Sequence, residues 1–209
     1  DSVKSRGLGD VYKRQGSTPA RAYSFLGQDH LPWDRVDVFL GDERWVAADD
    51  PSSNARMLRN TLFAEGPGAS AMFHAVPTVE LPDADASADA FAQLLTTICP
   101  GTPPVFDLIL LGLGDDGHTA SLFPGTEAPT IVDRWATVGR GKGLDRITLT
   151  APVLSAAYQV MFLVSGAGKR QALEQLLDPA GSVDLTPAKL VQPASTVVVF
   201  ADDPALNAS

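Results

Sequence analysis

The feature that constrains this chain most is a short apolar run that ends in a glycine-rich loop. The run extends from Phe106 to Leu113, interrupted only by Asp107, and overlaps the loop Gly112 to Gly117. A run this short cannot span a bilayer, and the turn residues around it favour a buried strand. Similar runs alternate with segments of helical periodicity along the chain. The alternation predicts an α/β fold with a Rossmann-like, mainly parallel sheet flanked by helices, and it allows a small antiparallel lobe.

Local sequence signals set the expected elements. Helices are expected at Pro19 to Leu26 with Thr18 as N-cap, at Asn54 to about Phe63 with Ser53 as N-cap, at Asp83 to Thr97, and at Lys169 to about Leu177. Strands are expected at Val36 to Leu40, near His74 and Val76, at Phe106 to Leu111, Arg146 to Thr150, Val160 to Val164 and Val197 to Phe200. Arg146 to Thr150 alternates as an antiparallel or edge strand does, and Pro124 to Gly143 is expected to be rich in loops.

Length and charge narrow the classes of function. The chain has 209 residues and a net charge of −9. This length suffices for one core, and we expect residues 16–209 to form a single domain behind an atypical tail, residues 1–15. The negative charge argues against a general nucleic-acid or membrane-surface binder, because both require a basic face. An anionic ligand must therefore be met by local cations.

Cysteine usage and the N-terminal segment indicate a compartment. Cys99 is the only cysteine, so the chain cannot form an intramolecular disulfide. The first fifteen residues are charged and lack the apolar centre of a secretory signal. We therefore expect a cytoplasmic protein, as a monomer or weak dimer.

Three predicted strands are followed by polar loops. The loops are Asp42-Glu43-Arg44, Asp115-Asp116-Gly117-His118 and Gly166-Ala167-Gly168-Lys169. In open α/β sheets, ligands bind beyond the carboxyl ends of the strands, where loops distant in sequence can meet. We therefore expect one site built from these three segments.

Two nucleotide-binding motifs are approached but not met. Gly112 to Gly117 matches G-x-G-x-x-G, yet it lies in mid-chain and places two carboxylates where a pyrophosphate would bind. Ser165 to Lys169 lacks the earlier glycine of a Walker A loop, and Arg170 stands where that motif has Ser or Thr. Neither segment predicts a nucleotide site.

His118 and Asp116 are the candidate catalytic pair. Imidazole titrates near neutral pH and can take a proton from water, which suits a general base, whereas a capping or core histidine would have no such role. Asp116 could orient the ring, contact sugar hydroxyls or cap the turn. The glycines and carboxylates in the same loop favour the catalytic interpretation.

Cations and glycines could bind an anion at the other two loops. The glycines before Lys169 let backbone N–H groups approach an anion at a helix start, although an exposed lysine at that start fits equally well. The fork of Arg44 could grip a phosphate or carboxylate, or it could belong to a solvated charge cluster. Gly16-Ser17-Thr18-Pro19 is a second small, hydroxyl-rich helix start.

Together these segments resemble the 6-phosphogluconolactonase family. The resemblance rests on Gly16 to Pro19, Gly41 to Arg44 with Ser53-Asn54, the block Asp107 to Gly125 (DLILLGLGDDGHTASLFPG), Ser165 to Lys169 and Leu185 to Ala188. It implies hydrolysis of 6-phosphogluconolactone to 6-phosphogluconate in the pentose phosphate pathway, without metal or organic cofactor. It also implies His118 as the base that activates water, with Asp116 beside it. The implied substrate- or phosphate-binding residues are Gly16, Ser17, Thr18, Arg44, Gly114 and Lys169.

Two other functions share parts of this pattern. Glucosamine-6-phosphate deaminases resemble the chain in the strand and the Asp-Gly-His loop, but they carry a glutamate shortly after the histidine, where this chain has Ala120 to Phe123. A sugar-phosphate sensor on the same sheet would need a DNA-binding segment, and no helix-turn-helix or basic patch is evident.

The chain departs from the family at its start. The family usually has a further strand and helix before a paired-glycine turn, whereas here Gln15 stands where the first glycine would be. Loss of a first strand would expose a sheet edge and remove part of the phosphate loop. The sequence therefore predicts lower stability or weaker substrate binding.

Overall fold

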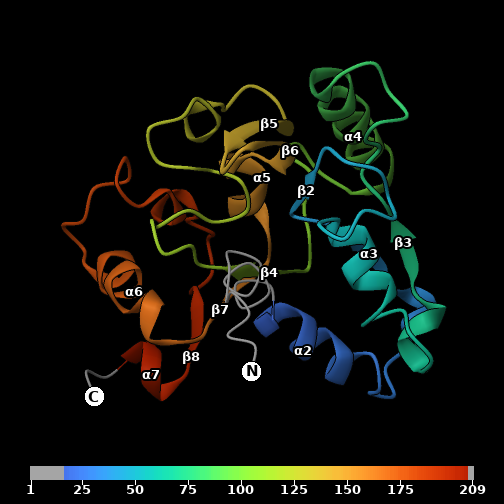
Figure 1. Ribbon diagram of the computed structural model, residues 1–209, viewed down its shortest axis with the longest axis horizontal. Coiled ribbons are helices and arrows are strands. Elements are labelled where there is room, and N and C mark those ends of the chain that lie inside the picture. Colours follow the sequence, from blue (N-terminus) through green and yellow to red (C-terminus); the bar gives the residue numbers. More distant parts are fainter. Residues whose placement is uncertain (1–16, 207–209) are drawn as a thin grey trace, which may run out of the picture. The chain divides into compact units, whose positions relative to one another are not determined.

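The computed structural model describes residues 17–206, and side chains from Pro19 onward. The chain divides into two compact units (Figure 1). The first takes the described residues up to Val38 together with Met57–Met72, and the second takes Phe39–Arg56 with the described residues from Phe73 on. Within residues 17–206, no helix has the length and apolar character needed to cross a membrane.

The first unit contains α2 (Ser17–Leu26) and the 3₁₀ turns Trp33–Arg35 and Pro67–Ser70. Helix α2 ends at Leu26 as predicted, and the N–H of Gly27 bonds to the carbonyl of Tyr23 at 2.9 Å. A Cβ on Gly27 would lie 2.6 Å from the carbonyl oxygen of Leu62. The predicted cap Thr18 is wrong, since the helix already includes Ser17. Such one-residue shifts are common at helix ends.

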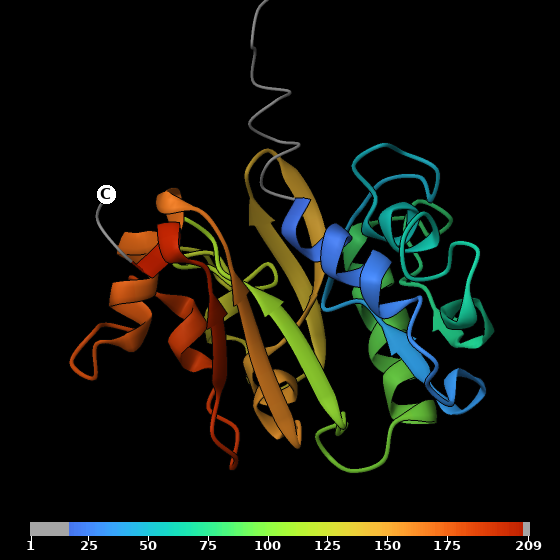
Figure 2. The same cartoon turned by 90° about the horizontal axis from the view of Figure 1, so that it is seen from below.

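A parallel sheet forms half of the framework of the second unit. Its strand order is β4-β7-β8, with β4 Leu108–Gly112, β7 Gln159–Val164 and β8 Val198–Ala201 running in the same direction (Figure 2). Alternate residues of β4 and β7 are buried, among them Val160 and Phe162. The loops after β4 and β7 therefore leave the sheet at the same edge, as the sequence predicted.

An antiparallel sheet forms the other half. Its order is β2-β6-β5, with β2 Asp42–Arg44, β6 Leu144–Leu149 and β5 Ala136–Gly141. Helix α4 (Ala84–Ile98), capped by Asp83, packs on β5 and β6, and its Phe91 and Leu95 are fully buried. The α/β class is confirmed, with an antiparallel part as large as the parallel one.

The remaining elements are short. Strands β1 (Asp37–Phe39) and β3 (Met72–His74) form a two-stranded sheet. The helices are α3 (Asn54–Arg59), α5 (Ala151–Ala156), α6 (Arg170–Leu177) and α7 (Asp203–Leu206), and further 3₁₀ turns span Ala128–Thr130, Ala167–Lys169 and Pro187–Leu190.

Several sequence expectations are corrected by these bounds. Helix α3 ends at Arg59 rather than near Phe63, because the hydroxyl of Thr61 donates to the carbonyl of Met57 at 2.8 Å and competes with continuation of the helix. Asp42 to Arg44 forms a strand rather than a loop, because it pairs with β6. Strand β6 is antiparallel, as one of the two predictions had it. The prediction of an edge strand is wrong, since β6 is the central strand of the sheet β2-β6-β5.

Strand β5 was missed within the stretch expected to be loops. Its two glycines disfavour a strand locally, but both are required by close packing. A Cβ on Gly139 would lie 2.4 Å from the carbonyl oxygen of Ser121, and one on Gly141 would lie 2.5 Å from the ring of Phe123. The glycines therefore bring β5 against the segment that follows His118.

Candidate active site

The loop after β4 is closed by its own backbone. The N–H of Gly114 donates to the carbonyl of His118 at 2.7 Å, and the hydroxyl of Thr119 donates to the carbonyl of Gly112 at 2.8 Å. Gly117 has a φ of +80° and a backbone neighbour, Thr186 Cα, 2.9 Å from where its Cβ would be. Glycine is therefore the residue this turn accepts at position 117.

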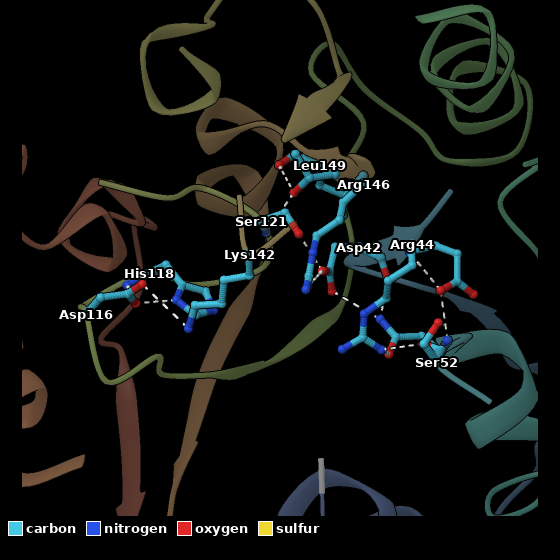
Figure 3. Close-up of polar contacts among 12 residues, drawn as sticks. Asp42, Arg44, Ser52, Asp116, His118, Ser121, Lys142, Arg146 and Leu149 are labelled. Carbon is cyan, nitrogen blue, oxygen red and sulfur yellow. Dashed lines mark hydrogen bonds and ion pairs between the residues drawn. The ribbon is translucent and has the colours of Figure 1, made fainter. Parts of the chain in front are cut away.

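Asp116 and His118 form a hydrogen-bonded pair inside this loop (Figure 3). Asp116 Oδ1 contacts His118 Nδ1 and also accepts from the backbone N–H of His118 at 3.3 Å. Burial alone would raise the pKa of Asp116, but the hydrogen bond and charge of His118 outweigh it, and the pKa lies well below its usual range. An ionised Asp116 favours the tautomer with the proton on Nδ1, and in that tautomer Nε2 of the ring could accept a proton.

Gly114 makes room for this pair. A Cβ at position 114 would lie 2.0 Å from His118 Nδ1 and 2.6 Å from Asp116 Oδ1. The space left by Gly114 supports a positioning role, and the contact with substrate that the sequence suggested stays a prediction.

Replacing Gly114 with alanine is expected to lower kcat for the reaction proposed below by about 10²-fold, because a displacement near 1 Å can cost that much. The matched control is Gly112→Ala, since the added Cβ there meets nothing within 4 Å. Steady-state kinetics of the two variants, with thermal melts alongside, make the comparison. Equal activity in both would show that the pair tolerates displacement.

Lys142 is a candidate site residue that could not be predicted from the sequence. It lies in the turn between β5 and β6, and its Nζ is 3.2 Å from Asp115 Oδ1 and 3.5 Å from Asp116 Oδ2. Burial would raise the pKa of Asp115, but the hydrogen bond and charge of Lys142 outweigh it and lower that pKa. Lys142 lies in the stretch Pro124 to Gly143, which was expected to be rich in loops. A lysine between two glycines is typical of exposed turns, so the sequence did not mark it as part of a site.

Lys169 joins the same charge cluster from the loop after β7. Its side chain is half-buried, and burial lowers its pKa, an effect that Asp115 opposes and Lys142 reinforces. The preceding loop is less open to an anion than the sequence suggested. The N–H of Gly166 donates to the carboxylate of Asp202 at 2.9 Å, and the hydroxyl of Ser165 donates to the same group at 2.7 Å.

Arg44 is held at a separate position, on β2. Its Nη1 donates to the carbonyl of Ser52 at 2.7 Å and to Asn54 Oδ1 at 2.5 Å, whereas its buried Nε has no hydrogen-bond partner among the described residues. Glu43, only 2% exposed, accepts from the backbone N–H of Arg44 at 2.7 Å. Glu43 and Arg44 are therefore held by specific hydrogen bonds and do not form a solvated charge cluster. Ser53 caps α3 as predicted, accepting from the N–H of Arg56 at 3.1 Å.

A chain of contacts runs from β2 to His118. Asp42 accepts a 2.5 Å hydrogen bond from the hydroxyl of Ser121 and lies 3.7 Å from Arg146 Nη1. The guanidinium of Arg146 lies over the ring of Phe123, whose other neighbour is the ring of His118 at 4.6 Å between centroids. Figure 3 shows Arg146 and Ser121 converging on Asp42. This network could not be predicted from the sequence, since no local pattern distinguishes a buried arginine in a strand from an exposed one.

The structure brings Gly114, Asp116, His118 and Lys169 together and places Arg44 on the strand that carries Asp42. Gly16 lies outside the described residues. Ser17 and Thr18 lie in α2 of the first unit, and their predicted contact with phosphate stays a prediction. Across residues 17–206, no three His, Cys, Asp or Glu side chains gather in a way that could hold a metal ion.

Comparisons with known proteins agree with this geometry. The family model for glucosamine-6-phosphate isomerases/6-phosphogluconolactonase matches residues 14–200. A 6-phosphogluconolactonase of Synechocystis sp. is 41% identical over 207 residues, which is 98% of this chain and 86% of the relative. One from Streptomyces coelicolor is 34% identical over 199 residues, 88% of this chain and 76% of the relative.

Solved structures give the same grouping. The 6-phosphogluconolactonase of Trypanosoma brucei superposes with a TM-score of 0.78 at 30% identity, covering 91% of this chain and 82% of its own. A monomeric glucosamine-6-phosphate deaminase superposes with a TM-score of 0.68 at 20% identity, covering 96% of this chain and 84% of its own, and shares the fold. The chain belongs to the glucosamine-6-phosphate isomerase/6-phosphogluconolactonase family.

Proposed function

We propose that this chain hydrolyses 6-phospho-D-glucono-1,5-lactone to 6-phospho-D-gluconate, the lactonase step of the oxidative pentose phosphate pathway. The observation that carries the proposal is the Asp116–His118 pair, which leaves Nε2 of His118 for a water. Relatives over nearly the whole chain are named for this activity. The cytoplasmic location expected from the sequence suits a step of central metabolism, and a monomeric or weakly dimeric state stays a prediction.

The proposed chemistry begins with a proton transfer. His118 Nε2 takes a proton from water as the oxygen attacks the lactone carbonyl, and Asp116 stabilises the imidazolium that forms. The tetrahedral intermediate collapses with cleavage of the bond to the ring oxygen, which receives the proton back from His118. One water is consumed, and the products are a sugar hydroxyl and a carboxylic acid, which becomes the carboxylate by releasing its proton to solvent. A positioned base contributes about 10²–10⁴-fold to such a step.

Local cations would bind the phosphate of the substrate. With a net charge of −9, the chain as a whole repels an anion, so the half-buried Lys169 and the guanidinium of Arg44 are groups suited to attract one. The family resemblance also implies phosphate contacts from Gly16, Ser17 and Thr18, and these stay predictions. Neither metal nor organic cofactor enters the proposed steps.

Replacing Lys169 with methionine is expected to raise KM for the phosphorylated lactone by about 10- to 100-fold with little change in kcat, because a charge-assisted hydrogen bond is worth about 1.5–3 kcal/mol. Gluconolactone without phosphate is the control substrate, and its kcat/KM should be the same for the variant and the wild type. An unchanged KM for the phosphorylated substrate would remove Lys169 from the phosphate site.

Deamination of glucosamine 6-phosphate is the alternative within the same family. Residues 119–125 contain no glutamate that could assist ring opening after His118, which argues against it. The test assays one protein preparation for both reactions: lactone hydrolysis, corrected for spontaneous hydrolysis, and ammonia release from glucosamine 6-phosphate. We expect the first without the second. Ammonia release without lactone hydrolysis would contradict the proposal.

A further inference from the structure

We infer that Lys142 is a positioning residue for the Asp116–His118 pair, acting through the carboxylate of Asp116 rather than by touching the substrate. The inference rests on the proposed function for its kinetic consequence only. Its structural content concerns the free protein and can be tested without activity.

The first observation is how the two oxygens of Asp116 are divided. Oδ1 serves His118, through the ring Nδ1 and the backbone N–H, while Oδ2 lies 3.5 Å from Lys142 Nζ (Figure 3). A carboxylate held at both oxygens cannot rotate about its terminal bond without breaking one of these interactions. Lys142 therefore fixes which oxygen faces His118, and with it the plane of the imidazole ring.

The second observation is the charge on the loop. Asp115 and Asp116 are adjacent acids, and their like charges would push the two side chains apart. Lys142 Nζ contacts both, at 3.2 Å from Asp115 Oδ1. Because one ammonium bridges two carboxylates, its loss would leave the loop with an unbalanced negative charge beside His118.

The third observation is the backbone conformation of the turn that carries Lys142. Lys142 has a φ of 55°, a left-handed conformation that is uncommon outside glycine, and it lies between Gly141 and Gly143. Gly141 packs against the ring of Phe123, which in turn contacts the ring of His118 at 4.6 Å between centroids. The turn is thus seated on the same aromatic side chain that flanks the imidazole.

A role as phosphate ligand fits these contacts less well. Lys142 already shares its ammonium between two carboxylates, and its side chain is 31% exposed. Lys169 has no hydrogen bond to either acid among the described residues, so its ammonium is better placed to bind a phosphate. A ligand role would also predict an effect on substrate binding, which separates the two possibilities by experiment.

The experiment compares Lys142→Met, Lys142→Arg and the wild type. The matched control is Arg140→Gln, which removes one positive charge from the same hairpin, where Arg140 pairs with Asp85 and Asp145 and not with the loop. Two quantities are measured: kcat and KM for the lactone, and the tautomer of His118, read from the ¹⁵N shifts of its ring nitrogens in the substrate-free protein at a pH where the ring is neutral.

For Lys142→Met we expect kcat to fall about 5-fold, with KM within about 2-fold of the wild type. We also expect a mixture of His118 tautomers in place of the single Nδ1–H form. Lys142→Arg should restore both quantities, and Arg140→Gln should change neither. A rise in KM with kcat and tautomer kept would overturn the inference in favour of a substrate ligand. If Lys142→Met changes neither the kinetics nor the tautomer, the contact of Lys142 with Asp116 is a surface ion pair and the inference is wrong.

The two proposals fail separately. If the wild type does not hydrolyse the lactone, the proposed function fails, while the tautomer comparison still decides the role of Lys142. If the wild type is active and Lys142→Met keeps the single tautomer, the positioning role is wrong and the proposed function stands.

Discussion

His118→Ala is expected to lower kcat/KM for 6-phosphogluconolactone by about 10²–10⁴-fold, because it removes the general base and leaves the rest of the site in place. The imidazole of His118 is hydrogen-bonded to Asp116 through Nδ1, and it is the imidazole of this loop. Its loss therefore leaves the loop without a histidine that could transfer the proton. The fall should appear mainly in kcat, since the proposed phosphate ligands lie outside the loop.

The measurement is initial velocity in an assay coupled to 6-phosphogluconate dehydrogenase, corrected for spontaneous hydrolysis. His30→Ala is the control for loss of an imidazole, since His30 is exposed and has no proposed role. Thermal melts of both variants should match the wild type. A His118→Ala variant that kept more than about a tenth of wild-type kcat would contradict the assignment of the base.

Glu43→Ala is expected to lower the free energy of unfolding by about 3 kcal/mol or more, the largest stability effect that the site predicts. The side chain is 2% exposed, and its carboxylate organises the start of α3 and the backbone of β2. Its four donors are the N–H groups of Arg44, Asn54 and Ala55, at 2.7, 2.8 and 2.7 Å, and the hydroxyl of Ser53 at 3.0 Å. Alanine would leave these donors without a partner in a buried site.

Urea unfolding measures the difference, read as a change in midpoint at constant m value. Glu127→Ala is the control, because Glu127 is an exposed acid whose loss should cost no more than about 0.5 kcal/mol. We also expect Glu43→Ala to raise KM, since Arg44 loses its backbone anchor. Equal stability of the two variants would show that water or a shifted backbone satisfies the donors.

The parts of the site that could be predicted from sequence are those written in one short segment. The block from Asp107 to Gly125 contains a strand, a tight loop and the Asp116–His118 pair, and each follows from local signals. Helix α4 was predicted for a similar reason, because its apolar residues recur with helical spacing.

The parts that could not be predicted depend on contacts between distant segments. Lys142 reaches Asp115 from the turn between β5 and β6, and Arg146 reaches Asp42 from the neighbouring strand β6. Strand β5 contains glycines, which in a sequence usually indicate turns. The reason for Gly139 is its packing on the backbone of Ser121, which only the structure shows. The space that Gly114 leaves for the imidazole could not be predicted either, because it is a three-dimensional property, and the predicted contact of Gly114 with substrate stays a prediction.

The central claim is tested most directly by following the ³¹P signal of freshly generated 6-phosphogluconolactone at several concentrations of the wild-type protein pretreated with EDTA. We expect a first-order decay to 6-phosphogluconate whose rate rises in proportion to the protein concentration and resists EDTA. Decay at the spontaneous rate with folded protein at every concentration would contradict it.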